Sequence, residues 1–141
     1  MIKVFQSIID GKNGDCIRAA VASIFELLPE QVPHFKLYER EWMNIYIHFL
    51  MAMGYSWNGN CHLHTKLAKE EFLAGKYADV KSYYIANAPS KTFAGLRHIV
   101  VVNKEGVVEH DPNPNGLWLG ENLLNQESMC SIDILKRIVV N

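Results

Sequence analysis

The sequence carries no excess of charge of either sign, because 14 basic residues offset 15 acidic ones and leave a net charge of −1. Proteins that bind nucleic acid or anionic membranes through electrostatics present a basic surface, so neither partner is expected. No apolar run approaches the roughly 20 residues that span a membrane. The N-terminal segment becomes polar at Lys3 and Gln6, too early for a secretory signal peptide.

Cysteine is scarce as well, with only Cys16, Cys61 and Cys130 in the chain. An odd number of cysteines without a regular spacing predicts no disulfide framework, so we expect a reduced, cytoplasmic protein. What the chain does contain is apolar material: 49% of its 141 residues are hydrophobic and 11% are aromatic. That composition predicts one folded domain over residues 1–141 with its own core.

Hydrophobic periodicity places helices mainly in the first half of the chain and strands in the second. We expect helices over residues 16–28, 37–53 and 66–75, a loop or a short strand over 55–63, and strands over 80–86, 96–102, 107–110 and 132–140. The turn residues between 102 and 107 predict a β-hairpin. Helices followed by strands favour an α+β fold, with N-terminal helices packed on a small antiparallel sheet.

The first helix begins at a cysteine that follows turn residues, in the order Gly14, Asp15, Cys16. The start of a helix has unpaired N–H groups and the positive end of the helix dipole, which together favour a thiolate over a thiol. Asp15 is expected to cap the helix. A lone cysteine at a helix start is more often a small buried residue, so a catalytic role depends on partners elsewhere.

Two later residues fit the roles of such partners. His98 opens a predicted strand, and Asp111 follows the second strand of the hairpin, which folds back beside the first. His98 would act as base, and Asp111 would orient its ring. Gln6 is the best candidate for an oxyanion-hole donor together with the Cys16 backbone N–H.

Further residues are candidates for a cleft around this cysteine: Asp15, Asn113, Trp57 and Trp118. Asn113 is also an alternative orienting residue for His98, because an amide can serve a Cys-His pair. A metal site built on Cys61, His62 and His64 is the competing interpretation. The spacing lacks a second tight pair of ligands, so neither a metal nor an organic cofactor is predicted.

The order of these motifs resembles the papain-like cysteine peptidase superfamily, and within it the compact C39-type domains that process bacteriocins. The motifs also resemble small proteins of bacteriophages and prophages. Gly14-Asp15-Cys16, His98 and Asp111-Pro112 carry the resemblance to the peptidases. The resemblance to the phage proteins also includes Val32-Pro33-His34-Phe35 and the tract His110-Asp111-Pro112-Asn113-Pro114-Asn115-Gly116.

The resemblance implies a papain-like fold and a hydrolase that cleaves an amide or isopeptide bond of a peptide or protein, with Cys16, His98 and Asp111 as its triad. The compartment would be the cytoplasm of a bacterium or of a phage-infected cell. Two departures from the family pattern favour a non-catalytic alternative: Gln6 stands farther from the cysteine than in C39-type domains, and Ile17 replaces the usual glycine. The alternatives are an acyl transferase with the same triad, and a non-catalytic papain-like protein that binds a host protein. The sequence predicts no oligomeric state.

Overall fold

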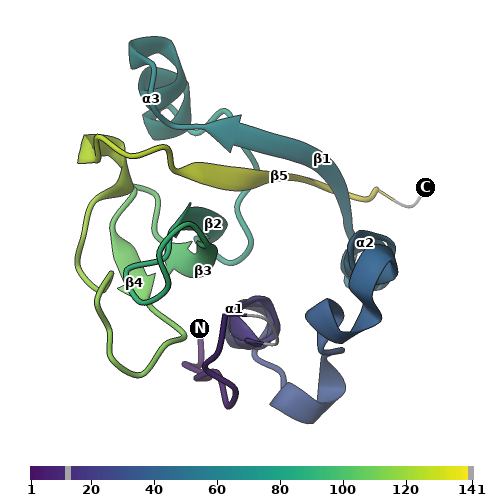
Figure 1. The fold of residues 1–141 in the computed structure, drawn as a ribbon. Helices are drawn as coiled ribbons and strands as arrows, with labels where there is room; N and C mark the ends of the chain where they lie inside the picture. The colour runs from purple at the N-terminus through teal and green to yellow at the C-terminus, as the bar shows by residue number, and fades with distance from the viewer. Residues whose placement is uncertain (12–13, 140–141) are drawn as a thin grey trace.

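The computed structural model describes residues 1–11 and 14–139 and has an α+β fold (Figure 1). In chain order its elements are α1 (Cys16–Phe25), η1 (Pro29–Gln31), η2 (Phe35–Glu41), α2 (Trp42–Ala52), β1 (Tyr55–His62), α3 (Lys66–Leu73), β2 (Tyr84–Pro89), β3 (Arg97–Val102), β4 (Val108–His110), η3 (Leu123–Asn125) and β5 (Ser131–Arg137). None of the described helices has both the length and the apolar character needed to cross a membrane. The α+β class expected from the sequence is confirmed.

The five strands form one antiparallel sheet in the order β1-β5-β2-β3-β4. Strand β3 is apolar along most of its length because both of its faces are buried. Ile99 and Val101 point into the core shared with α1 and α2. Val100 and Val102 point into a second core on the opposite face, as the two-residue period of a strand requires.

Different parts of the chain cover the two faces of the sheet. Helix α1 packs against β3, and α2 packs against β1 (Figure 1). Ala20 and Ala22 of α1 are fully buried, and such small side chains allow a helix to lie close to its neighbours. The opposite core takes Phe72 from α3 and Trp118 from the segment between β4 and β5.

The first two predicted helices differ from their expected ranges because of local backbone conformation. Helix α1 ends at Phe25 rather than at residue 28, since Glu26 adopts a left-handed conformation with φ 57°. The second predicted helix comprises η2 and α2, and η2 is kinked at Glu39, which has a non-helical conformation with φ 49° and ψ −118°.

Of the two alternatives for residues 55–63, a loop or a short strand, the structure has the strand: most of the segment is strand β1, paired with β5. Its Asn58-Gly59-Asn60 sequence is typical of a turn, but Gly59, at φ 93°, lies in an irregularity between the paired residues Trp57 and Asn60. A bulge uses the same residue types as a turn, so the local sequence does not distinguish them.

The N-terminal arm is bound to the start of α1 through the Asp15 side chain. Its carboxylate accepts hydrogen bonds from the backbone N–H groups of Ser7 and Ile8 and from the Ser7 hydroxyl, each at 3.0 Å. The side chain makes no capping bond to α1, so the predicted capping role is wrong. Asp15 instead fixes the course of the arm, which carries Gln6.

We expect Asp15→Ala to lower the free energy of unfolding by about 2–3 kcal/mol, because it leaves two backbone N–H groups without their acceptor. The measurement is urea denaturation at neutral pH. Ser7→Ala is the matched control: it removes only the hydroxyl donor and should cost less than about 1 kcal/mol. Equal losses in the two variants would show that the carboxylate does not hold the arm.

Candidate active site

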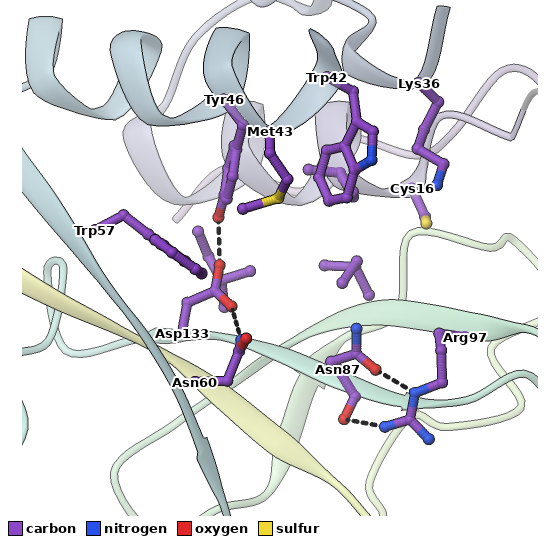
Figure 2. A pocket seen from close by; sticks show the side chains of 13 residues that line it. Cys16, Lys36, Trp42, Met43, Tyr46, Trp57, Asn60, Asn87, Arg97 and Asp133 are labelled. Carbon is purple, nitrogen blue, oxygen red and sulfur yellow. Dashed lines mark hydrogen bonds between the residues drawn. The ribbon is translucent and has the colours of Figure 1, made fainter. Parts of the chain in front are cut away.

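Cys16 occupies the first position of α1 and lies on the wall of two adjoining pockets. One pocket has a volume of about 390 Å³ and the other of about 320 Å³. The Cys16 side chain is partly exposed and belongs to no disulfide. Lys36 and Arg97 line both pockets as well, so two cationic residues flank the thiol (Figure 2).

His98 and Asp111 come together as the hairpin predicts. Strand β3 pairs antiparallel with β4, and Asp111 is the first residue after β4. The His98 Nε2 atom lies 2.6 Å from Asp111 Oδ1. The other carboxylate oxygen accepts from the backbone N–H of Trp118 at 3.1 Å. Both side chains are largely withdrawn from water, with 12% of His98 and 2% of Asp111 exposed.

Cys16 is the second side chain that interacts with the His98 ring. Burial disfavours a charged ring, but hydrogen bonding to Asp111 and to Cys16 outweighs it and raises the pKa of His98 to about 9. Burial likewise opposes the charged form of Asp111, yet hydrogen bonds from His98 and two backbone N–H groups hold its pKa below the ordinary value. At neutral pH the ring is therefore an imidazolium between a sulfur and a carboxylate.

Gln6 lines the smaller pocket, together with Cys16 and His98. Its backbone N–H donates to the Pro112 carbonyl at 2.9 Å, and its Nε2 donates to the Ile8 carbonyl at 2.9 Å. An amide nitrogen has two hydrogens, so one N–H of Nε2 remains for a further acceptor. The longer spacing between Gln6 and Cys16 thus still leaves Gln6 in the same pocket as the thiol.

The four residues predicted to line the cleft have different positions. Trp57 lines the larger pocket and Asn113 the smaller one, where the Asn113 backbone N–H donates to Asp111 at 3.0 Å. The prediction is wrong for Asp15 and Trp118, because both are buried and neither lines either pocket. Asp15 binds the arm, while Trp118 packs in the core and donates its indole N–H to the Pro89 carbonyl.

None of the other histidines and cysteines lines either of the two pockets. His110 contacts the Val4 carbonyl through Nε2 at 2.6 Å. The Cys61 sulfur lies 3.2 Å from the Tyr77 hydroxyl. Within residues 1–11 and 14–139, no three His, Cys, Asp or Glu side chains are grouped so that they could hold a metal ion.

Sequence analysis missed a polar cluster at the far end of the larger pocket, centred on Asp133 (Figure 2). The Asp133 carboxylate accepts from the Tyr46 hydroxyl at 2.6 Å and from the Asn60 side chain at 2.7 Å. Its recessed position raises the pKa of Asp133 to about 6, against the effect of these hydrogen bonds. The sequence signal that could have identified this cluster was a single carboxylate in the otherwise apolar run Ile132-Asp133-Ile134-Leu135.

Comparison with models of protein families, with curated proteins and with solved structures finds no match to this chain. The geometry of the site itself is therefore the basis for its chemistry. That geometry consists of a partly exposed thiol at a helix start, an imidazolium held by a carboxylate, and an amide donor in the same pocket.

The raised pKa of His98 predicts how stability changes with pH. A pKa of about 9 in the folded protein against 6.5 for an ordinary histidine means that the folded state binds the proton more tightly. The stabilisation is complete below pH 6.5 and is lost as the pH rises through 9. We expect the free energy of unfolding of the wild type to fall by up to about 3 kcal/mol over this range.

The measurement is urea denaturation at several pH values, with His98→Gln as the control. The variant keeps a polar side chain but no titrating group, so the difference between the two proteins isolates His98. Parallel curves for the two proteins would contradict the ion pair.

Proposed function

We propose that the protein is a cysteine hydrolase that cleaves an amide or isopeptide bond through Cys16, His98 and Asp111. The observation that carries the proposal is the contact of His98 with Asp111 at 2.6 Å on one side and its interaction with Cys16 on the other. A nucleophile, a base and a group that orients the base are the parts that thiol-based acyl transfer needs. The α+β architecture and the cysteine at the start of α1 support a papain-like arrangement.

The proposed reaction begins with attack by the Cys16 thiolate on the substrate carbonyl carbon, which forms a C–S bond and a tetrahedral oxyanion. The Gln6 Nε2 group and the backbone N–H of Cys16 are the donors for that oxyanion. When the C–N bond breaks, the amine leaves with the proton from His98. Water then attacks the acyl-enzyme, His98 takes one of its protons, and the C–S bond breaks to release the carboxylate product.

Two features favour catalysis over a purely binding role. A papain-like protein that had lost its activity would need neither an accessible thiol nor a fixed imidazole, yet Cys16 is partly exposed and His98 is held by Asp111. Ile17 lines the larger pocket next to Cys16 and leaves the thiol open to that pocket. The three free thiols fit a reducing compartment such as the cytoplasm.

The first test is the alkylation of Cys16 by iodoacetamide at about pH 6.5, followed by peptide mass. Because the neighbouring imidazolium stabilises a thiolate, we expect Cys16 to react at least about tenfold faster than Cys61, which is also partly exposed. In His98→Ala this advantage should disappear. Buried Cys130 is the internal control for unfolding, since it reacts only if the core opens. If Cys16 is alkylated at the same rate as Cys61, or at the same rate in His98→Ala as in the wild type, the thiolate–imidazolium pair is excluded.

The second test concerns Gln6 and uses p-nitrophenyl acetate as an activated acyl donor. We expect acetylation of Cys16, seen by mass, and slow release of acetate. Gln6→Ala should reduce the acetylation rate by about 10²-fold, because one of the two oxyanion donors is lost. Gln126→Ala changes a glutamine that bonds to Asn122 and Glu121 instead, and should leave the rate unchanged. An unaltered rate in Gln6→Ala would remove Gln6 from the mechanism.

A further inference from the structure

The larger pocket has opposite charges at its two ends (Figure 2). Lys36 and Arg97 lie near Cys16, whereas Asp133 lies at the far end. The walls between them are mostly apolar and aromatic: Ile17, Trp42, Met43, Trp57, Ile85 and Ile99. A ligand that fits this pocket carries a positive group at its far end and an electron-rich group beside the thiol.

Asp133 lacks the counter-charge that a recessed carboxylate normally has. Its two oxygens accept hydrogen bonds from the neutral side chains of Tyr46 and Asn60, and the neutral Trp57 side chain also interacts with the carboxylate. Among the described residues, no lysine, arginine or histidine lies within ion-pair distance of it. Each carboxylate oxygen has a second lone pair, so Asp133 can still accept hydrogen bonds from a ligand.

The two cations near Cys16 are held away from Asp133. The Lys36 ammonium lies over the Trp42 ring, 4.9 Å from its centroid. Arg97 donates to the Asn87 side chain and to the Met129 carbonyl. Because an arginine only donates, Asn87 must turn its oxygen toward Arg97, and its NH2 group therefore points toward the pocket (Figure 2). This group is a donor for a carbonyl of the ligand.

We propose that this pocket binds the basic side chain of a substrate residue, arginine or lysine, with its charged end against Asp133 and its methylene stem along the apolar walls. Aromatic faces beside a carboxylate favour a cation, and the stem of a basic residue favours apolar surface. A volume of about 390 Å³ suits one side chain with its adjoining backbone. That the bound residue belongs to a substrate rests on the proposed function, whereas the binding itself does not.

An ionised Asp133 carboxylate in this recessed position lowers the free energy of unfolding. This cost suggests that the carboxylate serves a ligand. Replacement of Asp133 by asparagine keeps the shape and lets Tyr46 and an inverted Asn60 amide form their hydrogen bonds again. The variant is therefore expected to fold, with an unfolding temperature at neutral pH no lower than that of the same protein with Asp133 unchanged.

The binding test uses ¹⁵N-labelled Cys16→Ala protein, which cannot turn over a ligand. Nα-acetyl-L-arginine amide and its neutral analogue of the same shape, Nα-acetyl-L-citrulline amide, are titrated separately. The indole N–H signals of Trp42 and Trp57 report on the pocket. Trp118, which is 3% exposed in the core, provides the internal control.

We expect the arginine compound to shift the signals of Trp42 and Trp57 but not that of Trp118, and to bind about tenfold more tightly than the citrulline compound. Asp133→Asn should abolish this preference. Asp79→Asn is the control: it removes a carboxylate charge outside the pocket, where Asp79 lies 3.9 Å from Lys104, and this variant should still prefer the arginine compound.

Equal affinities for the two compounds, no shift of Trp42 and Trp57 at the highest soluble concentration, or a preference that survives Asp133→Asn would each overturn the proposal. The comparison of the two compounds needs no Asp133 variant, so it remains decisive if that variant does not fold. Because no step of the experiment requires catalysis, its failure is separate from a failure of the Cys16 alkylation test.

Discussion

The packing of α1 against β3 is the constraint on which the candidate site depends. Cys16 begins α1 and His98 lies near the start of β3, so the contact between these two elements sets the position of the thiol relative to the imidazole. The fully buried alanines of α1 and the two buried faces of β3 keep that contact close. Burial of apolar surface thus positions the reactive groups, and the polar contacts orient them.

Two recessed carboxylates, Asp111 and Asp133, are in contrasting environments. Asp111 has the His98 imidazolium and two backbone N–H groups around it, and its pKa lies below the ordinary value. Asp133 has only neutral donors, and its pKa rises to about 6. A charge that is paired within the protein serves the structure and its reactive group, while a charge left without a partner in a pocket is available to a ligand.

The local sequence pattern was sufficient to predict those features that depend only on neighbouring residues. The cysteine at a helix start, the hairpin after His98 and the α+β class all follow from turn residues and periodicity, and the structure has each of them. The expected contact of His98 with Asp111 is present because hairpin geometry needs only short-range information. For residues 55–63 the local pattern left a loop and a short strand open, since a bulge at Gly59 has the composition of a turn and only pairing with β5 identifies the strand.

The sequence by itself determined the candidate site residues and their local placement, because residue type and immediate neighbours set the helix start and the hairpin. Only the tertiary structure decided what surrounds them. Asp15 and Trp118 proved to be buried, whereas Asp133, Lys36 and Arg97 line a pocket beside Cys16. Those five residues come from separate parts of the chain, so their exposure depends on the packing of α2, β1, β3 and β5 rather than on any local pattern.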